Sequence, residues 1–185
     1  MAIPDEEIRE APKISIIELI KKHPDFQSVS WVIGCMSKCK DEKRFHITHL
    51  KVKGNCFTAT DGNRVHHYES PGGDYTDGFY RVIKKNKSHI FLTSYGTDEK
   101  YPCTDDVLTP AKVKPFTVYR ADWNCFFAYA SIVRKLDEAI LNYNFIDDLL
   151  NLRDAFDCYI KNDKSPVVFT NQNKKAAIMT MKQSL

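Results

Sequence analysis

The sequence contains no apolar run that approaches the length of a membrane span. Its first residues, MAIPDEEIREA, are acidic and polar, whereas a signal peptide needs a basic start and an apolar core. We therefore expect a cytoplasmic protein with no membrane partner. The sequence also lacks a strong excess of either charge, since its net charge is only +3, so overall charge does not by itself predict nucleic-acid binding.

Signatures of catalysis are missing as well. The sequence has no nucleophile elbow, no glycine-rich phosphate-binding loop and no metalloprotease motif. Asp147 and Asp148 are adjacent on a predicted helix, so their side chains diverge and do not form a facing acid–base pair. Cys35 lies near histidines in the sequence, but spacing alone does not define a thiol nucleophile. We predict a protein that is not an enzyme and needs no cofactor.

The six cysteines do not follow the pattern of a disulfide-rich secreted domain, because they are widely scattered and several lie in apolar stretches. We expect them to be reduced. A Cys-x3-Cys spacing that begins at Cys35, followed by several histidines, loosely resembles a zinc site. However, His46 and His49 would point to opposite faces of a strand, and so would His66 and His67. We therefore expect histidines that are solvent-facing or hydrogen-bonded, and no metal.

What the sequence does contain is typical of a globular domain, with 43% hydrophobic and 28% charged residues in a chain of 185. We predict a flexible N-terminus over residues 1–12 and a single domain over residues 13–185. The domain has two predicted halves, at about 13–96 and 139–185. An insertion or connector at about 97–138, rich in proline and polar residues at its start, separates them.

In the first half, Ser15–Glu18 has the form of a capping box, which predicts a short helix through about Lys22 that Pro24 stops. A second helix is predicted over residues 30–38. Turn sequences at Lys53-Gly54, at Asp61-Gly62 and near Asn86 then separate a series of strands. The predicted strands cover residues 45–52, 55–60, 64–69, 79–84 and 89–94.

Apolar residues recur every three or four positions between residues 121 and 140, which predicts a long helix. Its core-facing side would carry Trp123, Phe126, Phe127, Ala130, Val133 and Leu136. A short helix at 145–153, with Asn144 as its cap, and strands at 156–161, 166–171 and 175–181 complete the chain. We expect the last strand to lie at a sheet edge, where it could pair with another copy. A helix followed by strands thus occurs twice, which predicts an α+β fold with two pseudo-twofold halves and antiparallel sheets.

Residues 44–52 (RFHITHLKV) form a predicted strand, and residues 59–65 (ATDGNRV) follow it with a Thr-Asp-Gly-x-Arg-aliphatic sequence. These two segments resemble the middle domain of the bacterial replicative sliding clamp, the β subunit of DNA polymerase III. Residues 101–108 (YPCTDDVL) resemble the aromatic-Pro-x-x-x-x-Val-Leu segment that closes the same domain. Residues 142–150 resemble a helix of the last clamp domain, and residues 165–168 and 177–181 resemble its final strands. These matches occur in family order and imply a DNA-clamp-like domain.

The sequence also departs from the family. A clamp chain holds three such domains and closes into a two-chain ring around DNA, whereas this chain is about half as long. The Met-Pro-Met ending of the family is Met179-Thr180-Met181 here, and Lys182 stands where arginine is usual. A single domain of this kind could encircle duplex DNA only as a homo-oligomer.

The resemblance implies a groove for a short hydrophobic motif of partner replication proteins. Aliphatic and methionine side chains would form an adaptable floor, and Arg64 or Lys182 would meet a polar group at the rim. Matched residue by residue, the peptide-binding positions are Ile47, Thr60, Gly62, Arg64, Val65, Pro102, Val107, Ile178, Met179 and Met181. An alternative is that these residues form only core and turn.

The family also lines its central hole with helices whose basic side chains contact phosphates without reading sequence. The basic residues on or beside the predicted helices are Lys21, Lys22, Lys38, Lys40, Arg134, Lys135 and Arg153. Acidic residues share these helices, so a solvated face of mixed charge is the alternative.

The sequence thus suggests a non-enzymatic scaffold of DNA replication or repair, and its reduced length suggests that a phage or mobile element encodes it. It would bind partner peptides, and as an oligomer it would encircle double-stranded DNA without sequence preference. The alternative is a stand-alone regulator that imitates a clamp and sequesters replication proteins without contacting DNA. A closed oligomer would favour the scaffold, and a persistent monomer would favour the regulator.

Overall fold

The structure is a computed structural model that describes residues 14–36, 47–95, 101–120 and 125–182. The predicted flexible N-terminus lies outside these residues. The first half of the chain contains β1 (Ile16–Ile20), α1 (Phe26–Ile33), β2 (Leu50–Lys53), β3 (Cys56–Thr60), β4 (Arg64–Glu69), β5 (Gly78–Lys85) and β6 (His89–Ser94). The second contains β7 (Phe116–Val118), α2 (Phe126–Val133), β8 (Ala139–Ile140), α3 (Tyr143–Leu149), β9 (Phe156–Tyr159), β10 (Val167–Asn171), β11 (Lys174–Ile178) and β12 (Met181–Lys182).

One antiparallel sheet runs through both halves. Its ten strands have the order β1-β6-β5-β2-β3-β4-β11-β10-β9-β7, and β12 pairs separately with β8. The halves meet where β4 pairs with β11 in antiparallel register, with Arg64 opposite Ile178 and Val65 opposite Ala177. The predicted α+β class with antiparallel sheets is therefore confirmed.

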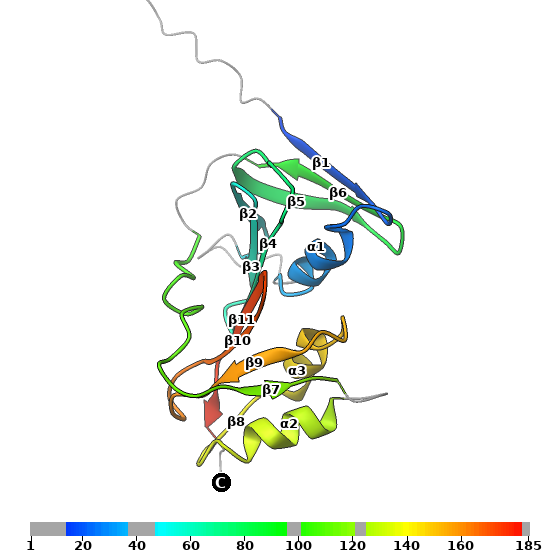
Figure 1. Ribbon diagram of the computed structural model, residues 1–185. Helices are drawn as coiled ribbons and strands as arrows, with labels where there is room; N and C mark the ends of the chain where they lie inside the picture. The colour runs from blue at the N-terminus through cyan, green and yellow to red at the C-terminus, as the bar shows by residue number, and fades with distance from the viewer. Residues whose placement is uncertain (1–13, 37–46, 96–100, 121–124, 183–185) are drawn as a thin grey trace, which may run out of the picture.

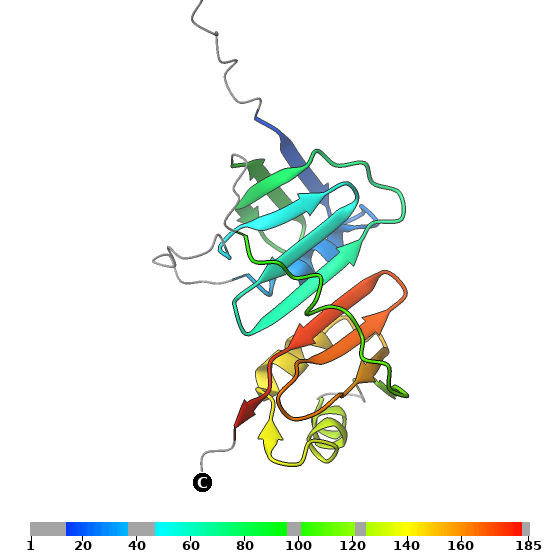
Figure 2. The ribbon, with the colours of Figure 1, turned by 90° about the vertical axis from the view of Figure 1, so that its left-hand side faces the viewer.

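The two faces of the central sheet are covered differently. Helices α1 and α3 lie on one face, and the connector over residues 101–115 crosses the opposite, outer face (Figures 1 and 2). The main core lies on the helix side and includes residues of both halves, among them Phe57, Ile146 and Phe169. A smaller cluster lies under the connector on the outer face, where Leu108 packs with Val65, Val168 and Ala177.

The segment predicted as the first helix is a strand. Ile17 and Leu19 of β1 are buried, whereas Ile16, Glu18 and Ile20 are exposed, so the burial alternates with the period of a strand. Strand β1 pairs along its whole length with β6, a partner more than sixty residues away in the sequence. This long-range pairing outweighs the local capping signal, and helix α1 begins only at Phe26.

The segment predicted as one long helix contains a short helix and a strand. Helix α2 has eight residues and buries Ala128 and Ile132, whereas Phe126 and Phe127 are 56% and 70% exposed. The predicted core-facing side was therefore wrong at both phenylalanines and at Ala130, which is also exposed, while Leu136 is buried as predicted. Trp123 lies outside the described residues. Helix α3 begins two residues earlier than predicted, because Asn142 and not Asn144 caps it by accepting the Asn144 N–H at 3.0 Å.

Most predicted strands lie close to the observed ones, and β4 and β6 have the predicted bounds. The last strand was placed incorrectly in the sheet. Strand β11 lies between β4 and β10, so it is central and not an edge, and the chain then continues into β12. Among the described strands of the large sheet, β1 and β7 form the two edges.

Candidate functional site

The turn between β3 and β4 is held in one conformation by its own side chains. The Asp61 carboxylate accepts the backbone N–H groups of Asn63 and Arg64, both at 3.0 Å. The Thr60 hydroxyl donates to the Arg64 carbonyl at 2.6 Å and accepts the Gly62 N–H at 3.1 Å. Gly62 has φ of +89°, a conformation that favours glycine. These hydrogen bonds therefore fix the conformation of the turn.

Three segments that are distant in the sequence converge beside this turn on the outer face. They are the β3–β4 turn with the start of β4, the connector around Pro102, and the end of β11, where the Met179 N–H donates to the Asn63 carbonyl at 2.8 Å. Together they enclose a cavity of about 130 Å³, which we call the outer-face pocket. Its lining residues are Thr60, Gly62, Asn63, Arg64, Val65, Pro102, Cys103, Thr104, Val107, Ala177 and Met179.

The outer-face pocket collects seven of the ten residues expected to bind a peptide. The three that do not line it are Ile47, Ile178 and Met181. Ile178 is fully buried in the main core, Ile47 is also buried, and Met181 lies on β12. Because neighbouring residues of a strand face opposite sides, Ala177 and Met179 reach the pocket where Ile178 cannot. The same alternation would have identified Ala177 from the sequence.

Arg64 lines the outer-face pocket, but its guanidinium group joins the two halves of the molecule. It donates to Asp61 at 3.0 Å, to Asp148 of α3 at 2.7 Å and to the Gly34 carbonyl at the end of α1 at 3.3 Å. It also lies 4.4 Å from the centre of the Phe145 ring. These contacts occupy the guanidinium, so its geometry is that of a structural bridge and not of a rim cation.

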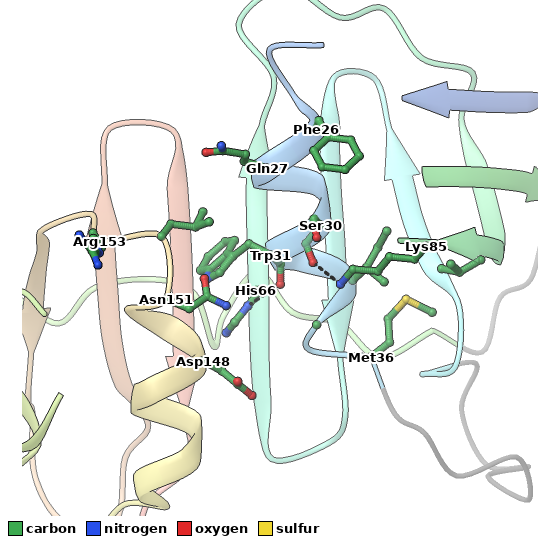
Figure 3. Close-up of a pocket in the computed structure, with 14 residues that line it drawn as sticks. Phe26, Gln27, Ser30, Trp31, Met36, His66, Lys85, Asp148, Asn151 and Arg153 are labelled. Atoms are coloured by element: carbon green, nitrogen blue, oxygen red, sulfur yellow. Dashed lines mark hydrogen bonds between the residues drawn. The ribbon is translucent and has the colours of Figure 1, made fainter. Parts of the chain in front are cut away.

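A larger cleft of about 830 Å³ lies on the helix side, between α1 and the end of α3 (Figure 3). Its floor includes Trp31, whose indole N–H donates to the Leu149 carbonyl at 3.1 Å and thereby joins α1 to α3. Charged residues of both signs surround it, with Lys85 and Arg153 as the cations and Asp148 as the anion. Lys85 donates to the Ser30 carbonyl at 2.8 Å.

His66 lies at the base of this cleft and stacks on the Trp31 ring at 4.1 Å. Burial, together with the nearby positive charge of Arg64, lowers the pKa of His66 to about 3, so the imidazole is neutral. Its Nδ1 lies 3.2 Å from the Trp31 carbonyl and donates to it, which leaves Nε2 as an acceptor. Within the described residues, Nε2 has no hydrogen-bond partner.

The five described residues that were expected to bind DNA follow three different elements of the fold. Lys21 and Lys22 follow β1, Arg134 and Lys135 follow α2, and Arg153 follows α3. Of these, Arg153 alone lines the helix-side cleft, and Lys135 lies over the Phe116 ring at 4.7 Å. Lys38 and Lys40 lie outside the described residues. The helix-side cleft itself is lined by charges of both signs.

The described segments contain five free cysteines and no cluster of metal-ligating side chains. Cys35, Cys56, Cys103, Cys125 and Cys158 are free. Burial raises the pKa of the Cys35 thiol, so this thiol is not poised as a nucleophile. No group of three or more metal-ligating side chains is found in these segments.

No helix within the described segments is long and apolar enough to span a membrane.

Comparisons with solved structures show where this architecture occurs. The β subunit of DNA polymerase III from Borrelia burgdorferi matches 92% of this chain, with a TM-score of 0.60 and 8% identity. The corresponding subunits from Pseudomonas aeruginosa and Thermotoga maritima match 96% and 95% of the chain, each with a TM-score of 0.60, at 13% and 11% identity. The chain has the sliding-clamp fold.

The clamp fold is established by structure and not by sequence. No protein-family model matches the chain, and no curated protein matches it significantly. The match spans 65% of the Borrelia chain, which is less than two thirds of it, and 68% and 69% of the other two chains. The structural similarity therefore shows the fold of this protein and does not show its partners.

Proposed function

We propose that this protein is a non-enzymatic, clamp-like scaffold of DNA replication or repair that binds a short hydrophobic segment of partner proteins in its outer-face pocket. The observation that carries the proposal is the convergence of residues 60–65, 102–107 and 177–179 around one cavity in a clamp fold. These are the segments whose sequences resemble the peptide-binding positions of sliding clamps. These three segments are distant in the sequence, and only the folded structure brings them together around one cavity.

The size and chemistry of the pocket suit a peptide side chain. A cavity of 130 Å³ has the volume of about four water molecules, well below that of a typical site for a whole small molecule. Val65, Val107 and Ala177 offer an apolar floor, and Met179 is 41% exposed at its margin, where a flexible thioether adapts to different ligands.

Peptide binding is tested by fluorescence titration of a labelled, amidated peptide with a Leu-Phe core. We expect saturable binding that Met179→Lys abolishes, because a lysine at the margin places a charge in an apolar pocket. Met179 is exposed, so this change should leave the fold intact. Ile83→Lys is the matched control, since Ile83 is 59% exposed on β5 and does not line the pocket.

A third variant defines the extent of the site. Met181 has the same 41% exposure as Met179 but lies on β12, outside the pocket lining. We expect Met181→Lys to bind the peptide as the wild type does. Unchanged binding by Met179→Lys would contradict the proposed site, and a flat titration of folded wild-type protein would contradict peptide binding altogether.

DNA binding and ring formation are the second part of the proposal. Helices α1 and α3 lie on one face of the sheet, and the resemblance to sliding clamps implies that this face would meet duplex DNA. The mixed charge of the helix-side cleft favours the alternative, a regulator that binds replication proteins away from DNA. Binding to a plain duplex that weakens steeply as salt rises would support the scaffold, and no binding at low salt would support the regulator.

A further inference from the structure

A second cavity continues from the outer-face pocket along the same face. It has a volume of about 570 Å³ and lies between the connector and the β9–β10 region, and we call it the connector cavity. Val107 lines both cavities. Tyr159 and Val168 line the connector cavity and belong to the same apolar cluster as Val65 and Ala177 of the outer-face pocket. The two cavities therefore share one continuous apolar floor.

The far end of the connector cavity is basic. The exposed side chains of Lys112 and Lys161 lie on opposite walls, one on the connector and one after β9, and Val113 beside them is 39% exposed. Neither lysine forms an ion pair with a described carboxylate. Asp106, nearer the shared Val107, contributes one opposing charge. An apolar residue followed by carboxylates matches this order of surfaces.

A neighbouring cavity on the other side of the 161–166 loop has the opposite net charge. It also adjoins the outer-face pocket, because Met179 lines both. Three carboxylates, those of Asp137, Glu138 and Asp163, line it together with Lys164 and Lys182. The connector cavity has two lysines and one carboxylate, so an acidic segment leaving the outer-face pocket is favoured toward Lys112 and Lys161.

We propose that a partner peptide seated in the outer-face pocket continues over Val107 into the connector cavity, and that this continuation carries an apolar residue and then acidic side chains. The inference rests on the proposed peptide binding and adds the chemistry of the flanking segment. The basic walls then select among partners that share the same hydrophobic core motif.

Fluorescence anisotropy with four labelled, amidated peptides tests this inference. The first has the Leu-Phe core alone, two others add Val-Glu-Glu after the core or Glu-Glu-Val before it, and the fourth replaces the glutamates of the tighter one with glutamines. We expect one acidic extension to bind about tenfold tighter than the core at low salt, and the glutamine version to lose most of this gain.

Two double variants locate the effect. Lys112→Glu/Lys161→Glu should bind the core peptide as the wild type does and lose the gain from the extension. Lys84→Glu/Lys87→Glu makes the same change in net charge at exposed positions of the β5–β6 hairpin and should keep the gain. All four lysines are exposed, so neither variant should unfold the protein.

The outcomes separate this inference from the function on which it rests. If the core peptide binds but neither extension tightens binding, or if the gain survives Lys112→Glu/Lys161→Glu, the flanking site is excluded and the outer-face pocket stands. Loss of the gain in both double variants would assign it to overall charge and also exclude the flanking site. If the core peptide does not bind at all, both proposals fail.

Discussion

Asp25 shows how a single buried charge organises the N-terminal half. It stands at the N-cap of α1 and is 2% exposed, yet its carboxylate does not cap the helix. Instead it accepts hydrogen bonds from Tyr68 at 2.6 Å, from Ser70 at 2.7 Å and from Tyr75. Burial by itself raises the pKa of the Asp25 carboxyl, but these hydrogen bonds outweigh it and hold the pKa below the ordinary value of 3.8. The carboxylate thereby joins β4 and the loop after it to the start of α1.

At this residue scale we predict that Asp25→Asn lowers the free energy of unfolding at neutral pH by about 1–3 kcal/mol. A carboxyl whose pKa is lowered on folding stabilises the protein above its unfolded pKa and loses that stabilisation as pH falls toward its folded pKa. The difference between wild type and variant should therefore be full at pH 7 and shrink below about pH 4. Urea titrations followed by tryptophan fluorescence, at pH 7 and again below about pH 4, measure this difference in the free energy of unfolding. A difference that stays constant or grows in acid would contradict this role of Asp25.

At the scale of the element, α2 shows that a helical pattern does not reveal which side of a helix is buried. Ile132 is fully buried and Ala128 is 6% exposed, whereas the larger side chain of Phe127 is 70% exposed. The helix has eight residues, and its apolar residues occur on more than one side. Packing against α3 and the neighbouring sheet decides which of them enters the core.

We predict that Ile132→Ala lowers the free energy of unfolding by about 2–4 kcal/mol, because it leaves a cavity in the core. Phe127→Ala, although it removes more atoms, should change it by less than about 0.5 kcal/mol, since the ring is mostly exposed. Chemical denaturation of the two variants side by side measures both values. The reverse order of effects would mean that another part of the chain covers Phe127 in solution.

At the scale of the whole molecule, the two edges of the large sheet among the described strands offer backbone groups for pairing between copies. The Lys21 N–H donates to the Ser88 carbonyl and the Ser94 N–H donates to the Ser15 carbonyl, so odd-numbered residues of β1 bond to β6. The N–H groups of Ile16, Glu18 and Ile20 therefore point outward. Edge β7 lies at the opposite end of the strand order, so pairing β1 with β7 of the next copy would be head-to-tail.

We predict that the wild type assembles into a closed oligomer and that Glu18→Pro remains monomeric and folded, because proline removes an outward N–H that β6 does not use. Leu19→Pro is the contrasting variant, since it removes an inward N–H from a buried strand position and should reduce the circular dichroism of the native fold. Sedimentation velocity over a range of concentrations gives the mass. Assembly of Glu18→Pro like the wild type would exclude β1 as the interface, and a wild type that is always monomeric would favour the regulator.

Local patterns in the sequence by themselves determined the main turns, several strands and part of the outer-face pocket of this protein. The turns at Gly54 and Gly62 and the strands β4 and β6 follow from glycine conformations and period-two alternation, which act between near neighbours. The matched segments, from the motif around Arg64 through the segment at Pro102 to residues 177–181, indicated the clamp fold because they occur together in family order. For the outer-face pocket, these segments contain seven of the lining residues that the resemblance assigned to peptide binding.

Only the tertiary structure decided the remaining features, because they depend on partners distant in the chain. Residues 16–20 form a strand because β6 is available to pair with them, although Ser15 and Glu18 suggest a helix cap locally. Strand β11 is central because β4 pairs with it across the junction of the halves. The bridge that Arg64 forms between α1 and α3 also depends on a distant partner, because Asp148 lies eighty-four residues away in the sequence. Contacts of such separation leave no periodic signal, so folding alone assigns them.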